Sequence, residues 1–363
     1  MKQNIYYNFY LYIVMDRDSD TYNKYPIRIG YACISNQLRS YDIFTSRSLT
    51  LATANVKGIE YIQQLVLANV DDLLKILIFN EAHGIRFFRI SSCVFPHLSN
   101  PKLADSDYDL NFVKNQLKAI GSYAKAHGHR LTMHPGQFIQ LGSDRDEIVL
   151  QSAKDLANHV QLLQMLGYTP ADNSVLIIHG GGTYGSKTET LVRWKRNFLI
   201  LPSIIKSYIS LENDEFSYGV DDLLPVCEEL NIPFCLDLFH NKISKDRVSI
   251  TKGLIKRIFK TWSRRGMVPK FHFSEQEPDL RKGAHSKTLD SLPIYLFRLP
   301  ILFKTPLDIM LEVKDKDTSV FKIYYKYFNI KMDANGRITY EPKDKIKKVV
   351  FSKIKTKSKP LIE

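Results

Sequence analysis

Cysteine is scarce in this sequence, and no hydrophobic run is long enough to cross a bilayer. The 363 residues include four cysteines, Cys33, Cys93, Cys227 and Cys235, and no two of them form a C-x-x-C pair. We therefore expect reduced, structural thiols in an intracellular protein. A transmembrane helix needs about 20 consecutive apolar residues, so we also expect a soluble protein without a membrane partner.

The sequence also lacks a cleavage site for a secretory signal and any visible internal repeat. Its start, "MKQNIYYNFYLYIVMDRDSD", has only a short apolar segment before a run of acidic residues, so we expect no secretory signal. No shift in composition divides the central part of the chain. We expect an N-terminal extension over residues 1–25, one domain over 26–330 and a basic C-terminal tail over 331–363.

Positive charge is in excess. Lysine and arginine number 51 against 38 aspartates and glutamates, which gives a net charge of +13. Part of this excess lies in the lysine-rich segment 342–360, but the remainder of the chain is still positive. A protein of this charge is attracted to polyanions by electrostatic steering and counterion release. The charge therefore favours nucleic acid as the partner.

Short apolar runs alternate with helical patterns along the chain. The expected strands are 27–34, 85–92, 130–134, 174–180, 208–213, 232–238, 269–274 and 307–313. The expected helices are 56–82, 108–127, 145–166, 188–206, 220–230, 250–264, 288–303 and 317–328. Successive βα units imply parallel strands with right-handed crossovers. Eight of them favour an α/β fold of one closed (β/α)₈ TIM barrel over an open doubly wound sheet.

Imidazole and carboxylate side chains fall at the ends of the expected strands, where a TIM barrel has its active site. They are His134, His179, Glu212, Asp237, His240, His272, His285 and Glu312. A single histidine at such a place is most often structural. A group of this size is not, because buried charge is costly unless it is paired or binds a metal. These residue types suit Zn²⁺, Mn²⁺ or Fe²⁺, and their number predicts a cluster of more than one ion.

A glycine-rich segment offers a competing interpretation. "HGGGTYGSK", residues 179–187, contains G-x-G-x-x-G after a strand and before a helix, and Glu212 ends the following strand. This pattern imitates a dinucleotide-binding fingerprint. It would leave His134, Asp237 and Glu312 unexplained, however, so we expect no nucleotide cofactor.

Between about Ile27 and about Lys314 the sequence resembles the UV-damage endonucleases. The resemblance is carried by "IRIGYACI", "FRISSCVFP", "LTMHPGQF", "IHGGGTYGSK", "LENDE", "CLDLFHN", "KFHFSEQ", "KGAHS" and "MLEVK", in matching order and spacing. It implies a barrel with two or three divalent ions, usually Mn²⁺, with Zn²⁺ or Mg²⁺ as alternatives. The implied partner is damaged double-stranded DNA, cut 5′ to the lesion with 3′-hydroxyl and 5′-phosphate ends. We expect the chain to act as a monomer.

The resemblance also implies roles for particular residues. The family's metal-binding positions fall on the strand-end residues named above. Lys270 matches a lysine that can be carboxylated, and Gln137 and Phe138 match a pair that wedges into DNA at the lesion. The hypothesis is that Glu212 bridges ions. Its expected partners are Asp237, His272 and Glu312 for one ion, His134 and His179 for a second, and His240 and His285 for a third.

Further residues complete the expected site. The expected catalytic set consists of Glu212, Lys270, His240 and Tyr31, although Tyr31 could equally be a packing residue. Lys270, together with Arg281 and Lys282, would neutralise phosphate charge; ordinary solvated charge is an equal alternative for the last two.

The sequence departs from the family pattern at two places. Where the family commonly has Ser-His-Pro with a metal-binding histidine, this chain has Ser99-Asn100-Pro101, with His97 three residues earlier. Either Asn100 or His97 replaces that ligand, or one metal site is impaired. The second wedge residue, often tyrosine, is Phe138, which keeps the ring and loses the hydroxyl.

Three rival functions remain. A xylose isomerase-like sugar isomerase or epimerase would use similar barrel ligands but needs no strong positive charge. An abasic-site nuclease of the endonuclease IV type is close in chemistry. A damage-binding protein without nuclease activity is the third, because Asn100 could mark a lost metal site.

Overall fold

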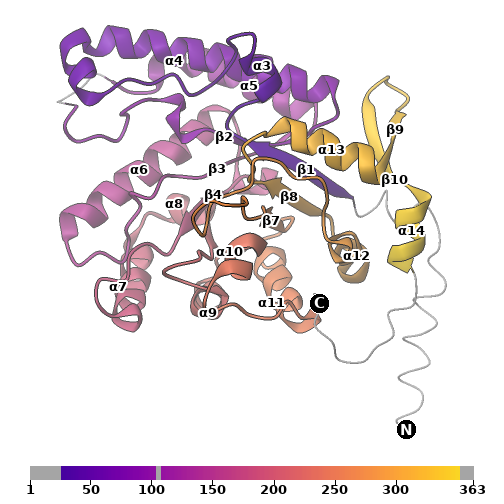
Figure 1. The fold of residues 1–363 in the computed structure, drawn as a ribbon. Coiled ribbons are helices and arrows are strands. Elements are labelled where there is room, and N and C mark those ends of the chain that lie inside the picture. Colours follow the sequence, from indigo (N-terminus) through magenta and orange to yellow (C-terminus); the bar gives the residue numbers. More distant parts are fainter. Residues whose placement is uncertain (1–25, 104–107, 352–363) are drawn as a thin grey trace.

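Eight parallel strands form a closed barrel, with helices around it (Figure 1). The structure, a computed structural model, describes residues 26–103 and 108–351. The strands are β1 (Ile27–Ala32), β2 (Phe87–Ile90), β3 (Arg130–Met133), β4 (Leu176–His179), β5 (Ile209–Glu212), β6 (Phe234–Asp237), β7 (Lys270–Phe273) and β8 (Leu307–Leu311). β1 pairs with both β2 and β8, which closes the barrel. Each strand lies inside an expected strand, so the predicted TIM barrel is confirmed.

The helices occupy the connections between the strands. They are α3 (Asn36–Arg39), α4 (Leu51–Ala82), α5 (Lys114–Ala126), α6 (Asp146–Met165), α7 (Lys187–Ile200), α8 (Ser203–Tyr208), α9 (Val220–Leu230), α10 (Leu238–Ile243), α11 (Lys252–Ser263), α12 (Ile294–Phe303) and α13 (Asp317–Tyr327). The expected single helix over 188–206 is wrong, because Pro202 divides α7 from α8. Leu201, which precedes this proline, has ψ 147°, since a residue before proline avoids the helical conformation.

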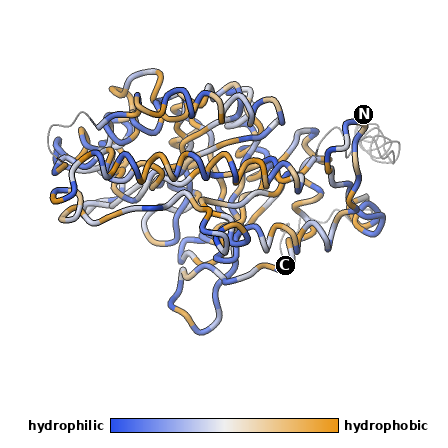
Figure 2. The backbone as a smooth tube through the Cα atoms, turned by 90° about the horizontal axis from the view of Figure 1, so that it is seen from above, coloured by the Kyte–Doolittle hydropathy of each residue, from blue (hydrophilic) through white to orange (hydrophobic). Residues whose placement is uncertain are grey.

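Hydrophilic and hydrophobic residues alternate along the helices (Figure 2). In α4 the buried positions include Ile62, Val66, Leu73 and Leu77, whose spacing puts them on one face of the helix. This face packs against the barrel as part of one continuous hydrophobic core. No helix in the described ranges is long and apolar enough to cross a membrane.

The interior of the barrel is unusually polar. At its N-terminal end Asp308 accepts hydrogen bonds from Arg28 Nε (2.7 Å) and Arg130 Nη1 (2.7 Å). Burial would raise the pKa of Asp308, but the two guanidinium groups lower it. Above this network, fully buried Lys270 lies 3.3 Å from Thr132 Oγ1. Asp308 is therefore paired with two guanidinium groups, whereas Lys270 has no carboxylate partner among the described residues.

A hairpin that the sequence did not predict follows the barrel. β9 (Phe328–Met332) and β10 (Ile338–Pro342) pair antiparallel, and α14 (Asp344–Phe351) comes after them. Tyr340 stacks on Tyr324 of α13 with ring centroids 3.7 Å apart, and Arg337 Nε donates to Glu81 Oε1. The expected domain boundary at residue 330 therefore falls inside β9, and this part of the expected tail packs against the barrel.

Candidate metal centre

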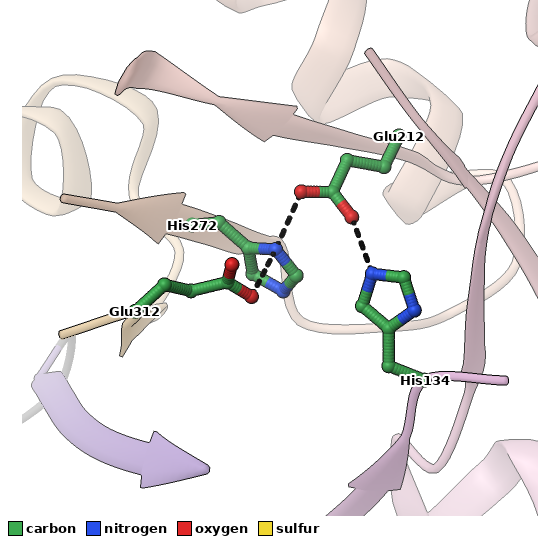
Figure 3. Close-up of side chains that lie close together, drawn as sticks. All are labelled: His134, Glu212, His272 and Glu312. Carbon is green, nitrogen blue, oxygen red and sulfur yellow. Dashed lines mark hydrogen bonds and ion pairs between the residues drawn. The ribbon is translucent and has the colours of Figure 1, made fainter. Parts of the chain in front are cut away.

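Four side chains at the ends of different strands converge at the C-terminal mouth of the barrel (Figure 3). This first ligand group consists of His134, Glu212, His272 and Glu312, with one ligand atom of each within 4.8 Å of the others. Glu212 accepts from His134 Nε2 at 3.0 Å and from His272 Nδ1 at 2.6 Å. His272 Nδ1 also lies 3.0 Å from Glu312 Oε1. Strand ends far apart in the sequence thus build one compact cluster.

Glu212 also belongs to a second ligand group, with Asp237 and His240. Asp237 ends β6 and caps α10, because its Oδ1 accepts from the His240 backbone N–H at 2.7 Å. This cap turns the carboxylate toward His240 Nδ1, 3.8 Å from Oδ2. The hypothesis had grouped Asp237 with His272 and Glu312, whereas the structure groups it with Glu212 and His240. A carboxylate shared by two groups is the arrangement that a bridging ligand requires.

The two remaining imidazoles lie at the edge of this cluster. His179 Nε2 is 3.8 Å from Glu212 Oε2, and the rings of His179 and His134 have centroids 5.1 Å apart. His285 donates from Nδ1 to the Glu312 carbonyl oxygen at 2.8 Å, and its ring centroid is 5.6 Å from that of His240. All eight residues expected as the core ligands therefore face one region of the mouth.

Unsatisfied polar atoms indicate that this donor set suits a cation. His179 Nδ1, Asp237 Oδ2 and His272 Nε2 are buried without a hydrogen-bond partner among the described residues. Buried polar atoms nearly always have a partner, and leaving one unpaired is costly. Neutral imidazole and carboxylate together are suitable ligands for Zn²⁺, Mn²⁺ or Fe²⁺. The residues present therefore fit divalent ions.

The pKa values of the cluster residues also indicate that the site suits a cation. Burial, with the negative charges of Glu212 and Glu312, raises the pKa of Asp237 to about 7. Burial disfavours the charged form of His240, but the surrounding carboxylates, Asp237 first, raise its pKa to about 10. Burial lowers the pKa of His272 to about 4, so this imidazole is neutral near pH 7. The raised pKa values of Asp237 and His240 thus reflect the negative charge of the neighbouring carboxylates, and such an environment favours a cation.

Arg89 is a cation at the mouth for which no role was expected from the sequence. It forms an ion pair with Glu312. Burial lowers the pKa of Arg89, but the negative charges of Glu312 and Glu212 raise it above its usual value. The signal was present in the sequence: Arg89 is the only charged residue within β2, one position before the strand ends.

Lys270 lies inside the barrel, whereas Tyr31 faces the helices around it. Lys270 points into the barrel, where burial lowers its pKa to about 7. Tyr31 is also buried, but it packs edge-on against Phe88 and donates from its hydroxyl to Asn80 Oδ1 of α4 at 2.7 Å. Tyr31 therefore faces the surrounding helices, and the expectation of a catalytic role is corrected: the packing alternative describes its position.

Neither candidate for the replaced ligand joins the cluster. His97 donates from Nε2 to the Leu49 carbonyl oxygen at 2.8 Å, and its Nδ1 lies 3.2 Å from Asn100 Nδ2. Asn100 Oδ1 accepts from the Lys102 backbone N–H at 3.0 Å. Both side chains are thus engaged within their own turn, and this structure gives neither of them a place among the ligands.

The expected DNA-contacting residues are exposed. Phe138 has 77% of its surface accessible, which excludes the alternative that it is a core aromatic. Gln137 beside it is also exposed, as are Arg281 and Lys282 in the loop after β7. They belong to the connections that follow β3 and β7, at the end of the barrel where the ligand groups lie.

The glycine-rich segment after β4 is held by neighbouring side chains. The Gly182 N–H donates to Gln140 Oε1 at 2.8 Å, so this amide is already satisfied. A Cβ at Gly180 would lie 2.5 Å from the Tyr218 ring. The glycines therefore permit close packing between the loops after β3, β4 and β5, which explains them without a dinucleotide.

Comparison with known proteins gives a consistent set of relatives. The family model described as "UV-endonuclease UvdE" matches residues 27–341. A protein of Acanthamoeba polyphaga mimivirus is 62% identical over 315 residues, covering 87% of this chain and 96% of that protein. The UV-damage endonuclease of Schizosaccharomyces pombe is 38% identical, and the match covers 83% of this chain but only 50% of the yeast protein. The crystal structure of SacUVDE matches with a TM-score of 0.72 and 31% identity, covering 82% of this chain and 96% of that one.

Proposed function

The chain belongs to the UV-endonuclease UvdE family, and from this premise we propose that it is a metal-dependent DNA repair endonuclease. It cuts the phosphodiester 5′ to UV photoproducts and other distorting lesions, leaving 3′-hydroxyl and 5′-phosphate ends. The observation that supports this proposal best is the buried cluster around Glu212, which joins two ligand groups at the mouth of the barrel.

The ligand groups would hold two or three divalent ions, with Mn²⁺ as the first candidate and Zn²⁺ or Mg²⁺ as alternatives. Such ions neutralise phosphate charge, activate water and stabilise the leaving oxygen. Glu212 would serve as the shared ligand, because its two oxygens face different imidazoles. Arg89 would keep Glu312 oriented toward the cluster through their ion pair.

Lys270 would act from beneath the cluster. Its pKa of about 7 gives the amine a substantial neutral fraction near neutral pH, and the neutral amine is the form that carboxylation requires. In its protonated form the same side chain would add positive charge under the mouth. Its Nζ faces only Thr132 Oγ1 among hydrogen-bond partners in the described residues, at 3.3 Å.

Recognition of damage would come from the loop after β3. An aromatic side chain inserted into duplex DNA must separate stacked bases, and this costs less where a lesion has already weakened the stack. The Phe138 ring is exposed on a short turn, with the exposed Gln137 beside it. Arg281 and Lys282, also exposed, could contact the phosphate backbone.

The proposal is tested by incubating the purified chain with UV-irradiated supercoiled plasmid in Mn²⁺, in EDTA, and in EDTA followed by excess Mn²⁺. We expect nicking in the first and third reactions and none in the second, with unirradiated plasmid left intact throughout. Nicking that EDTA does not affect would contradict the role of the cluster.

Defined duplexes separate the remaining alternatives. Faster cutting at an abasic site than at a pyrimidine dimer would favour an abasic-site nuclease. Tight binding to lesions without cleavage in any divalent ion would favour a damage-binding protein, and conversion of a ketose without nicking would favour an isomerase or epimerase.

A further inference from the structure

Glu215, in the loop between β5 and α9, is an acidic residue at the mouth to which neither ligand group assigns a role. Its side chain is only 13% exposed, and its Oε2 lies 3.6 Å from His240 Nε2. Within the described residues this ion pair is the one polar contact of the carboxylate. A largely buried carboxylate with a single partner retains free lone pairs for a further cation.

The orientation of the neighbouring imidazoles shows where such a cation would lie. His240 Nδ1 faces the Asn213 carbonyl oxygen at 3.1 Å, and His285 Nδ1 faces that of Glu312 at 2.8 Å. A ring nitrogen that faces a carbonyl oxygen carries the proton, and the other nitrogen is then the one that can bind a metal. Nε2 is therefore the atom of both rings that would coordinate an ion, whereas His240 Nδ1, the nitrogen nearer to Asp237, carries the proton. Glu215 lies on the Nε2 side of His240.

The spacing of the two rings also suits a shared ion. Two imidazoles bound to one tetrahedral ion at bond lengths of about 2.1 Å have ring centres roughly 5 Å apart. The centroids of His240 and His285 are 5.6 Å apart. Two imidazoles alone make an incomplete site, however, because catalytic ions commonly have three protein ligands and one open position.

Gly283, in the loop after β7, leaves room for the Glu215 carboxylate. A Cβ at this glycine would lie 2.8 Å from Glu215 Oε1, and the residue has φ +90°. The loop that carries His285 therefore passes directly against Glu215. Glycine at this point allows the Glu215 carboxylate, which is close to His240, to lie against the loop that carries His285.

We propose that Glu215 is the third protein ligand of the ion held by His240 and His285. This inference rests on the metal-dependent function proposed above and adds a ligand from the loop after β5. The three ligands would come from α10, from the loop after β5 and from the loop after β7, and the ion they hold would supply positive charge for a phosphate oxygen.

The test is a Mn²⁺ titration of metal-free protein, followed by calorimetry and by metal analysis after dialysis. The variant is Glu215→Gln, and Glu275→Gln is the control, because Glu275 is an exposed glutamate in the loop after β7 and loses the same charge. We expect the weakest Mn²⁺ site to lose at least about 10-fold in affinity in Glu215→Gln, with the control unchanged. Wild-type stoichiometry and affinities in Glu215→Gln would overturn the inference.

A second pair of variants tests the same contact from the opposite side. Gly283→Ala should weaken the same site, because the new methyl group displaces Glu215. Gly266→Ala is the control, since Gly266 also has positive φ and has nothing within 4 Å of the added Cβ. Equal effects of both substitutions would overturn the inference.

Nicking by the wild-type chain distinguishes a failure of this inference from a failure of the proposed function. If the wild type nicks in Mn²⁺ and Glu215→Gln binds metal normally, this inference fails and the proposed function stands. If the wild type neither binds Mn²⁺ nor nicks, both fail.

Discussion

The substitution Glu212→Gln tests the core of the proposed mechanism, because it changes one buried charge and almost no volume. Glu212 is fully buried and is the only residue common to both ligand groups in the described structure. Glutamine keeps the shape of the side chain but can no longer act as an anionic bridge. We therefore expect incision to be lost while DNA binding, which depends on the surrounding charged and exposed residues, is largely retained.

The contacts of Glu212 indicate how much the substitution should lower the nicking rate. Removal of one preorganised electrostatic group typically lowers catalytic rates about 10²–10³-fold. Because Glu212 serves two groups, we expect the upper end, about 10³-fold or about 4 kcal/mol in the barrier. The expected loss in the free energy of unfolding is smaller than this change in the barrier. His272, with a pKa of about 4, is neutral at pH 7.5, so the metal-free variant loses hydrogen bonds to neutral rings, about 1–3 kcal/mol.

The assay compares initial nicking rates on UV-irradiated plasmid, gel-shift affinity for a lesion duplex, and the thermal unfolding midpoint. Glu275→Gln is the matched control, because it removes an equal charge from an exposed loop position. A Glu212→Gln rate within tenfold of the wild type, in a folded protein that binds DNA normally, would refute the bridging role.

Three further predictions follow from the same structure. Phe138→Ala should lower the ratio of nicking on damaged to intact duplex, whereas Leu150→Ala, at a similarly exposed site on α6, should not; an unchanged ratio in Phe138→Ala would remove the wedge. Tyr31→Phe should lower the free energy of unfolding by about 1 kcal/mol, through the lost hydrogen bond to Asn80, with nicking unchanged; a tenfold slower rate in a stable variant would restore a catalytic role. Burial lowers the pKa of His129 from 6.5 to about 4, so its neutral form contributes stability that is fully present above pH 6.5 and is lost as the pH falls toward 4. In urea unfolding His129→Gln should therefore lose less stability than the wild type between pH 6.5 and 4, and equal losses would contradict this assignment.

The barrel could be predicted because its signal is repeated. Each βα unit supplies a short apolar run and a longer amphipathic segment, and eight consistent repeats outweigh errors at individual boundaries. The hairpin β9–β10 could not be found in this way, because only Phe328 of β9 is buried and its other four residues are exposed. Its position depends on contacts such as Tyr340 on Tyr324, which no local pattern reveals.

The convergence of the strand-end histidines and carboxylates could be predicted because parallel strands of a barrel end at one rim. Tyr31 was misplaced because strand position alone does not say which face a side chain takes. Side chains alternate between the two faces of a strand, so the inward position of Arg28 in β1 puts Gly30 on the inner face and Tyr31 on the outer one. Glu215 was missed for a different reason: it lies in a loop, where no periodicity fixes the direction of a side chain.

The two ends of the barrel interior show why the charge excess at the mouth is informative. At the N-terminal end Asp308 is paired with both Arg28 and Arg130, so that network needs no further cation. At the C-terminal end the three carboxylates of Glu212, Asp237 and Glu312 share two cations, Arg89 and the protonated His240, while His272 is neutral near pH 7. The buried carboxylate at the N-terminal end is therefore paired with guanidinium groups of the chain itself. An uncompensated buried carboxylate is costly. The shortage of positive charge at the mouth is therefore better explained by metal ions that bind there than by incomplete packing.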